Sequence, residues 1–391
     1  MTDPQEARSG EPEGLRVVLL TNFVPPYRLP LYEAIARRVG SLTVLVSTPV
    51  EGNRGWRPSV GDLDVRVQRT LTIPRAWRHP AGFSDTTYVH VPLDTFAQLR
   101  RLDPDVVVSA ELGFRSLFSA LYRMRRPRVR LVLWATLSER TERGRGGLRL
   151  LLRRWLLRRA DRVIVNGAGG ERYVARFGVT ADRIDRIPYV ASPGFREAAD
   201  HAPESAGLRN LLFVGQLTER KGLLPFLRAL DVWSRSNPDR EITLTIAGGG
   251  PQLEALQQAR GSGFVELRIL GELAPDALPA LFAAADAFVF PTLADEWGVV
   301  VNEALAAGLP VLGSVHSQAV EELCAEGETG WIFDPEVQAS TLAALDRAFA
   351  TPAEQLRQMR ANGQDRAREL TPDWAAERVV QALLGATRGS R

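Results

Sequence analysis

The chain has 391 residues, of which 45% are hydrophobic and 24% are charged, a composition typical of a globular protein. Its length indicates two domains, because single cores rarely grow beyond about 250–300 residues. One cysteine and four histidines argue against a disulfide framework and against a Cys/His metal site. The net charge of +3 combines a balance of +12 in residues 1–200 with −9 in residues 201–391. Halves of opposite sign suggest two modules with different partners.

The first half of the chain begins with a polar segment, residues 1–14, which lacks the pattern of a signal peptide and is expected to be a disordered tail. Short β-branched apolar runs follow at 15–20, 41–47, 105–110, 130–135 and 161–167. Nearly continuous hydrophobicity is typical of parallel strands buried on both faces. Segments with helical spacing lie between them. We therefore predict one Rossmann-like domain over residues 15–190.

The second half repeats this plan after a Pro-, Ala- and Gly-rich stretch, residues 191–209, which is predicted to be a linker. Apolar runs recur at 210–215, 241–248, 264–270, 287–291 and 309–314, with helical patterns in the gaps. The alternation indicates βαβ units and a second domain over residues 210–370. The predicted fold class is therefore α/β, with two doubly wound Rossmann-like domains.

Lys221 is the only lysine in the chain, and it stands in the stretch FVGQLTERKGL, residues 213–223. A predicted strand ends before this stretch and a predicted helix follows it, so Lys221 lies beyond the carboxyl end of a strand, where open sheets bind ligands. Gly215 and Gly222 allow close backbone approach, and the helix N-terminus favours an anion. The alternative is an exposed lysine kept by chance in a tight turn.

In the stretch FPTLADEWGVVVNEALAAGLPVLGS, residues 290–314, seven residues separate the carboxylates of Asp295 and Glu303. Trp297 and Gly298 are predicted to open a helix, where their amide hydrogens and that of Val299 are free to meet anionic oxygens. Carboxylates beside such a turn suit hydroxyl groups of a sugar or ribose, while the amides hold a diphosphate. The alternative is an acidic helix cap with Glu303 exposed.

Five segments occur in order here: VGQLTERKG, TIAGGGP, ILGEL, DAFVFPTLADEWGVVVNEALAAGLPVLGS and GETGWIFDP. Together they resemble the C-terminal half of the retaining family 4 glycosyltransferases of GT-B fold, over roughly residues 160–370. The segment NFVPPYRLPLYEAIA resembles the opening of members that build bacterial surface polysaccharides and related glycans. The resemblance implies that the two domains face each other across a cleft. It also implies that residues 15–190 bind the acceptor, that residues 210–370 bind the nucleotide sugar, and that the helix in 371–391 crosses back to the N-terminal domain.

The resemblance also assigns roles to residues. Lys221 would bind the donor diphosphate, Asp295 would contact the transferred sugar and Glu303 would hold the ribose hydroxyls, and these three form the expected catalytic set. The implied donor-binding residues are Gly215, Gln216, Arg220, Lys221, Gly249, Asp295, Trp297, Gly298, Val299 and Glu303. The family usually has arginine at the position of Gln216 and glutamate at that of Asp295. Arg220 could replace the missing phosphate charge.

The implied reaction is transfer of a sugar from a nucleotide diphosphate sugar to a glycan, lipid-linked or small-molecule acceptor, with retention of anomeric configuration. The pathway would be polysaccharide or glycoconjugate biosynthesis. Stabilising the leaving diphosphate would be the main task of the protein. No cofactor and no metal is expected, because lysine and backbone amides supply the positive charge. The alternatives are a non-hydrolysing sugar-nucleotide epimerase of the same fold and a catalytically silent scaffold that binds membranes or polyanions.

Acceptor-side candidates follow the predicted strands of the first domain. They are Asn22, Tyr27, Arg28, Glu111 and Ser138. Polar residues at these places also serve as turn caps or in surface ion pairs, and that alternative stays open.

An arginine-rich helical segment, residues 148–159, is a candidate membrane contact. At helical spacing Leu148, Leu151, Leu152, Trp155 and Leu156 form an apolar stripe for the core. Leu150 and Leu157 then emerge on the opposite side among arginines, which suits the anionic inner face of the plasma membrane and a cytoplasmic, peripheral protein. The alternative is a solvated arginine-rich face. No nucleic-acid-binding motif is found, so nucleic acid is not an expected partner.

Overall fold

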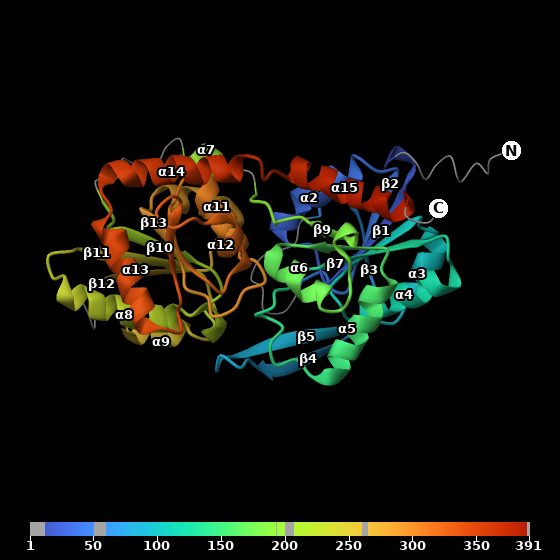
Figure 1. Ribbon diagram of the computed structural model, residues 1–391, viewed down its shortest axis with the longest axis horizontal. Helices are drawn as coiled ribbons and strands as arrows, with labels where there is room; N and C mark the ends of the chain where they lie inside the picture. Colours follow the sequence, from blue (N-terminus) through green and yellow to red (C-terminus); the bar gives the residue numbers. More distant parts are fainter. Residues whose placement is uncertain (1–11, 51–59, 193, 200–206, 260–264, 389–391) are drawn as a thin grey trace. The chain divides into compact units, whose positions relative to one another are not determined.

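The computed structural model describes residues 12–50, 60–192, 194–199, 207–259 and 265–388, which fall into two units (Figure 1). Unit 1 comprises Met1–Trp77, Thr86–Pro188 and Pro372–Arg391, and unit 2 comprises Arg78–Asp85 and Tyr189–Thr371. Residues 1–11 of the predicted tail and 200–206 of the predicted linker lie outside the described residues.

The described part of unit 1 contains a seven-stranded parallel sheet in the order β3-β2-β1-β6-β7-β8-β9. Its strands are β1 (Arg16–Thr21), β2 (Ser41–Val46), β3 (Asp64–Val67), β6 (Val106–Ala110), β7 (Arg130–Ala135), β8 (Arg162–Val165) and β9 (Ile184–Arg186). A separate hairpin consists of β4 (Thr70–Arg78) and β5 (Ser84–Pro92). The buried strands were predicted from their apolar runs, whereas β3, β9 and both strands of the hairpin were not, because they lack such runs.

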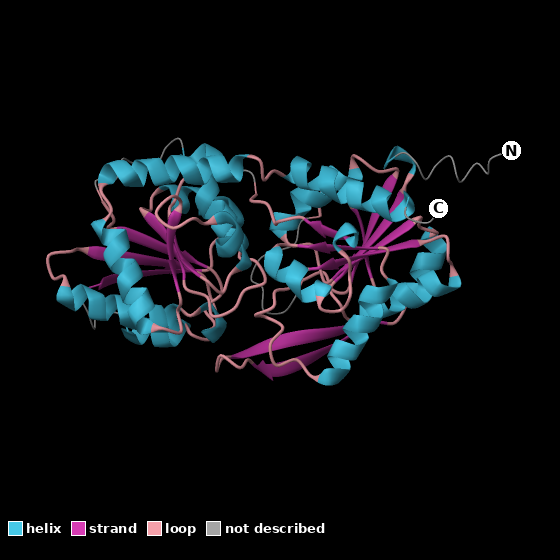
Figure 2. Ribbon diagram, in the orientation of Figure 1, coloured by secondary structure: helices cyan, strands magenta, loops and turns pink. Residues whose placement is uncertain are grey.

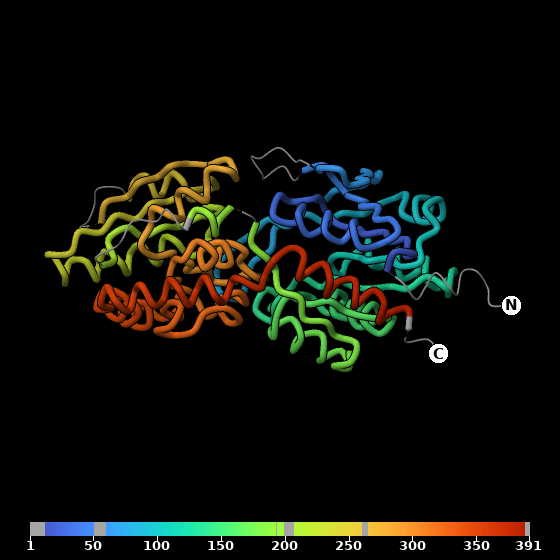
Figure 3. The backbone as a smooth tube through the Cα atoms, turned by 90° about the horizontal axis from the view of Figure 1, so that it is seen from above, coloured from blue at the N-terminus to red at the C-terminus, as the bar shows by residue number. Residues whose placement is uncertain are grey.

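The helices of unit 1 cover its sheet (Figure 2). They are α2 (Leu29–Ala36), α3 (Thr95–Leu102), α4 (Phe114–Arg125), α5 (Gly147–Arg159), α6 (Ala168–Ala175) and α15 (Pro372–Arg388). Although α15 ends the chain, it packs against α2 near the start of the chain, as Figures 1 and 3 show. An ion pair of 2.8 Å between Asp373 of α15 and Arg38, which follows the end of α2, adds to this packing.

The described part of unit 2 contains a six-stranded parallel sheet in the order β12-β11-β10-β13-β14-β15. Its strands are β10 (Asn210–Val214), β11 (Ile242–Ala247), β12 (Val265–Gly271), β13 (Ala287–Phe290), β14 (Val311–Ser314) and β15 (Gly330–Phe333). In chain order this is the 3-2-1-4-5-6 arrangement of doubly wound nucleotide-binding folds. The predicted α/β class with two doubly wound sheets is therefore confirmed.

Helices cover both faces of the unit 2 sheet (Figure 2). They are α7 (Phe195–Ala199), α8 (Leu223–Ser236), α9 (Leu253–Ala259), α10 (Leu278–Ala283), α11 (Val299–Ala306), α12 (Gln318–Leu323), α13 (Gln338–Ala350) and α14 (Ala353–Arg368). Alternate side chains of β10 point to opposite faces. Leu211 and Phe213 join the core formed with α8 and α13, whereas Leu212 and Val214 join the core formed with α10, α11 and α12. Burial on both faces explains the continuous apolar run of this strand.

Candidate active site

The strand order of unit 2 reverses between β10 and β13, which pair with each other. In open parallel sheets, ligands bind beyond the carboxyl ends of the strands at this switch point. The two loops at that place are the ones that contain Lys221 and Asp295. The topology therefore brings together two segments that the sequence separates by 74 residues.

Lys221 ends a short 3₁₀ turn, Glu219–Lys221, and Gly222 follows it. Gly222 has a φ of 67°, and a Cβ there would lie 2.1 Å from the carbonyl oxygen of Pro291. Only glycine fits this close approach between the two loops. The loops are also joined by hydrogen bonds, because the Thr292 hydroxyl and the Leu293 amide both donate to the Arg220 carbonyl, at 3.1 and 2.8 Å. The position of Lys221 is thus set by the backbone of both loops.

The Asp295 carboxylate lies among the basic groups of the first loop. Its Oδ2 atom is 2.5 Å from Lys221 Nζ and 3.2 Å from Arg220 Nη1. Lys221 also stands over the ring of Phe290, 4.9 Å from its centroid. The side chains of Lys221 and Asp295 are each only 12% exposed, so the pair is shielded from most solvent.

A fourth charged residue of this cluster, Asp85, was missed by the sequence analysis. Its Oδ2 atom accepts a 3.0 Å hydrogen bond from Arg220 Nε. Asp85 lies at the start of the second strand of the hairpin, 135 residues before Arg220, and belongs to unit 2 together with the hairpin tip. Nothing in the pattern of an exposed hairpin indicated that its acidic residue would pair with an arginine of the switch point.

The electrostatics of the cluster keep Asp295 ionised. Burial alone would raise the pKa of Asp295, but the charges of Lys221 and Arg220 outweigh burial and lower the pKa below its ordinary value. A hydrogen bond from the Trp297 backbone acts in the same direction. Burial would likewise lower the pKa of Arg220, and the carboxylates of Asp295 and Asp85 reverse that effect. Asp295 and Arg220 are therefore both ionised near neutral pH.

Glu303 lies on α11 and is 6% exposed. Within the described residues no hydrogen bond reaches its side chain. Burial raises its pKa to about 7. An exposed Glu303, one of the predicted alternatives, is therefore excluded. A buried carboxyl without a donor is a costly arrangement, and this one is adapted to accept hydrogen bonds from a ligand.

The turn before α11 is built as predicted around Trp297 and Gly298. Gly298 is the N-cap, with a φ of 102°, and a Cβ there would lie 2.6 Å from the Phe290 ring. The Trp297 side chain is 2% exposed, and its Nε1 donates a 2.7 Å hydrogen bond to Asn302. The Trp297 backbone already hydrogen-bonds to Asp295, whereas it was predicted to be free. Val299 begins the helix.

The remaining donor-side candidates surround the loop after β10. The Gly215 amide donates to the Ala247 carbonyl at 3.0 Å, and the Leu217 amide donates to the Gly249 carbonyl at 2.8 Å. These bonds hold the loop after β10 beside the loop after β11. Gln216 lies between the two bonded residues of its loop and is partly exposed. Gly249 is thus placed next to the segment that leads to Lys221.

The sheet of unit 1 has its own switch point, between β1 and β6. Two predicted acceptor-side residues meet there: Asn22 Nδ2 donates a 2.6 Å hydrogen bond to Glu111 Oε1. Arg115, which was not predicted, contacts both of them and donates a 2.7 Å hydrogen bond to the Ser47 hydroxyl. Glu111 has a φ of 73°, a conformation that is strained for a glutamate. Strain of this kind is often retained at binding sites.

The other acceptor-side candidates have structural contacts. Arg28 is buried, with its guanidinium 4.7 Å from the centroid of the Trp134 ring, and Tyr27 precedes it in a 3₁₀ turn. Ser138 is buried, and its hydroxyl donates a 3.2 Å hydrogen bond to Thr141. These contacts stabilise the fold of unit 1.

The prediction for the apolar face of residues 148–159 was confirmed for Leu152, Trp155 and Leu156, which pack in or against the core, and was wrong for three other leucines. Leu157 is fully buried, whereas Leu148 and Leu151 are 83% and 66% exposed, and Leu150 is 38% exposed. The first turn of α5 extends beyond the core, so residues assigned to the buried stripe reach solvent there. Near the end of α5, the core takes up Leu157 beside Leu156. Among the described helices, none has both the length and the apolarity required to cross a bilayer.

Known families match both halves of the chain. A family model described as glycosyl transferases group 1 matches residues 196–366, and a glycosyl transferase 4-like domain matches residues 7–190. Glycogen synthase of Mycobacterium tuberculosis is 32% identical over 240 residues, which cover 61% of this chain and 57% of that protein. D-inositol 3-phosphate glycosyltransferase of Pseudarthrobacter chlorophenolicus is 28% identical, over 50% of this chain and 49% of that protein. The chain thus spans about half the length of these curated relatives.

Solved structures share the fold over almost the whole chain. Sucrose-phosphate synthase from Thermosynechococcus elongatus aligns with a TM-score of 0.65 and 19% identity, covering 93% of this chain and 97% of that one. The Anabaena protein HepE, in complex with UDP, aligns with a TM-score of 0.70 and 15% identity, covering 94% of this chain and 99% of that one. At such low identity the likeness shows the fold alone.

Proposed function

The chain belongs to the group 1 glycosyltransferases, since a family model for each half matches it, and we propose that it transfers a sugar from a nucleotide diphosphate sugar to an acceptor. One observation carries this proposal. Lys221 and Asp295 meet at the switch point of the nucleotide-binding type of sheet, with the buried carboxyl of Glu303 eight positions further along the chain. A cation, a sugar-binding carboxylate and a ribose-binding carboxyl are the groups that such a donor requires.

In the proposed complex, Lys221 and Arg220 bind the diphosphate and stabilise the charge that develops on it as the sugar leaves. Asp295 contacts the sugar, and Glu303 accepts hydrogen bonds from the ribose hydroxyls. Gly215, Gln216, Gly249 and the amides of the turn before α11 would complete the donor site. HepE, which shares the fold, was solved with UDP, and this supports a uridine nucleotide as the first donor to test.

Retention of anomeric configuration and the absence of a metal requirement are part of this proposal. In the proposed complex, Lys221 and Arg220 would supply to the diphosphate the positive charge that a divalent cation otherwise provides. Transfer is therefore expected to continue in the presence of a chelator. The configuration of the product, read from the anomeric coupling in its NMR spectrum, tests retention directly.

For the acceptor we propose a glycan, a lipid-linked glycan or a small molecule, bound at the switch point of unit 1 around Asn22, Glu111 and Arg115. The charged and amide groups there suit the hydroxyls of a sugar. Polysaccharide or glycoconjugate biosynthesis at the cytoplasmic side of the membrane is the corresponding role. The exposed Leu148 and Leu151, among the arginines of α5, provide an interfacial surface for it.

The experiment that tests the proposal is a thermal-shift screen with UDP, GDP, ADP and their sugar conjugates. A ligand at 100 times its dissociation constant adds about 2.7 kcal/mol of stability, which raises the melting midpoint visibly. One nucleotide class should stabilise the unmodified protein and fail to stabilise the Lys221→Ala variant. The exposed Arg228→Ala is the matched control. Absence of a shift with every nucleotide would contradict the proposal and favour the non-catalytic scaffold. Both matched families are glycosyl transferases, which argues against the epimerase alternative.

A further inference from the structure

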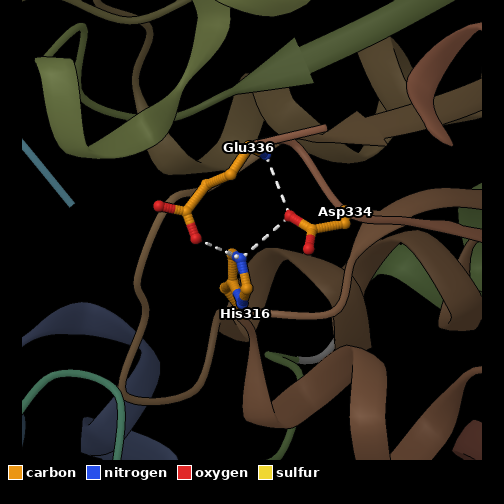
Figure 4. Close-up of side chains that lie close together, drawn as sticks. All are labelled: His316, Asp334 and Glu336. Atoms are coloured by element: carbon orange, nitrogen blue, oxygen red, sulfur yellow. Dashed lines mark hydrogen bonds and ion pairs between the residues drawn. The ribbon is translucent and has the colours of Figure 1, made fainter. Parts of the chain in front are cut away.

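A second cluster of ligand-type side chains lies at the edge of the unit 2 sheet (Figure 4). His316 follows β14, whereas Asp334 and Glu336 follow β15. Because β14 and β15 are paired and parallel, their carboxyl ends meet and bring these loops together. The possible ligand atoms of the three residues all lie within 4.8 Å of one another. The cluster includes none of the residues proposed to bind the donor.

The distances in this cluster fit a shared metal ion as well as an ion pair. His316 Nε2 lies 3.2 Å from Asp334 Oδ1 and 3.2 Å from Glu336 Oε2. A charge-assisted N–H···O hydrogen bond is usually about 2.7–2.9 Å long, and one N–H aims well at a single acceptor. Two ligands bonded to a tetrahedral zinc at about 2.0–2.1 Å are separated by about 3.3 Å. The equal spacing to both carboxylates thus matches two edges of a zinc coordination shell.

The backbone around the cluster is already held in place. The His316 amide donates to Ser314 Oγ at 3.0 Å, and the His316 carbonyl accepts a 3.1 Å hydrogen bond from the Asp295 amide. Asp334 Oδ1 accepts a 2.9 Å hydrogen bond from the Glu336 amide, which orients one carboxylate. Ligands fixed by such outer contacts lose little freedom when they bind a metal.

We propose that His316, Asp334 and Glu336 form a binding site for a divalent transition metal of the zinc type. One imidazole and two carboxylates are ligands that zinc accepts, and three protein ligands leave a fourth position for water. The carboxylates are each 37% exposed and His316 is 12% exposed, so an ion can enter from solvent. The metal would tie the loop after β14 to the loop after β15. Through the His316 carbonyl, it would also steady the backbone of Asp295.

The test uses the full chain without a histidine tag, first dialysed against a chelator. Titration calorimetry with Zn²⁺ should show one site per chain, and Zn²⁺ should raise the melting midpoint. Co²⁺ should produce the visible absorption of a low-coordinate site. Asp334→Asn and Glu336→Gln should each weaken Zn²⁺ binding at least about tenfold, because even outer-shell changes cost about 10–100-fold. The exposed Glu328→Gln should leave binding unchanged.

The proposal would be overturned by the absence of saturable Zn²⁺ binding to the unmodified chain, or by equal affinity in the unmodified chain and both ligand variants. Preference for Mg²⁺ over Zn²⁺ would also overturn it, because it would indicate an oxygen-only site. Glu336→Gln alters an exposed side chain, so its folding is expected to be normal, and circular dichroism checks this. All readouts are independent of sugar transfer, and failure of either proposal leaves the other standing.

Discussion

Replacement of Glu303 by glutamine tests the buried carboxyl of the proposed donor site. Burial raises the pKa of Glu303 from 4.5 to about 7 in the folded protein. Between these two values the folded state binds a proton that the unfolded state has released. The contribution of Glu303 to the free energy of unfolding is therefore largest below pH 4.5, falls as pH rises through this window, and is constant above about pH 7.

The size of this effect follows from the two pKa values. The full shift is worth about 3.4 kcal/mol, of which about 2.5 kcal/mol falls between pH 5 and pH 8. Glutamine has nearly the same shape as a protonated glutamate and does not titrate. In the absence of ligand, the free energy of unfolding of the Glu303→Gln variant should therefore be close to that of the unmodified protein at pH 5. At pH 8 the variant should be about 2.5 kcal/mol more stable than the unmodified protein.

The assay is urea unfolding at several pH values from 5 to 8, performed on the unmodified chain and on Glu303→Gln. The Glu328→Gln variant, in which an exposed glutamate is changed, is the control and should run parallel to the unmodified protein. Parallel pH profiles for Glu303→Gln and the unmodified chain would refute the reasoning, because they would mean that Glu303 ionises in the folded state as it does in water.

Three further predictions concern the other charged and apolar groups. Lys221→Ala should lower turnover, measured by nucleotide release, about 10²–10³-fold, while circular dichroism should show an intact fold. Lys221→Arg should also have low activity, because the rigid guanidinium fork of arginine replaces the point charge of lysine. Activity of Lys221→Ala equal to that of the unmodified protein would remove Lys221 from the proposed mechanism. Asp85→Asn should tighten binding of a nucleoside diphosphate about fivefold, or about 1 kcal/mol, because it removes a carboxylate that neutralises Arg220. Titration calorimetry measures this affinity. Weaker binding by the variant would mean that Asp85 mainly orients Arg220. The double variant Leu148→Ser, Leu151→Ser should co-sediment less with anionic vesicles than the unmodified protein does. The control is Leu270→Ser in unit 2, where the leucine is 46% exposed, and this variant should bind vesicles normally. An equal loss of binding in both variants would contradict a membrane-binding surface on α5.

The amino-acid sequence by itself determined the fold class of this protein. Continuous β-branched runs such as the one at β10 can only be accommodated where both faces of a strand are buried, and this requires helices on both sides of a parallel sheet. The two sets of runs therefore predicted two doubly wound sheets, which the structure confirms. The motif around Lys221 and the one around Asp295 were also visible in the sequence, because each combines glycines with charged residues just beyond a strand.

Only the tertiary structure decided which charged groups meet. The pairing of Lys221 with Asp295 depends on β10 lying beside β13, and the pairing of Arg220 with Asp85 depends on a hairpin distant in sequence. The same holds for His316 with Glu336, which require β14 beside β15. Helical spacing likewise could not predict that Leu148 reaches solvent while Leu157 is buried, because periodicity gives the relative direction of side chains but not where a helix leaves the core. These contacts and exposures are determined by long-range packing, which a local sequence pattern does not encode.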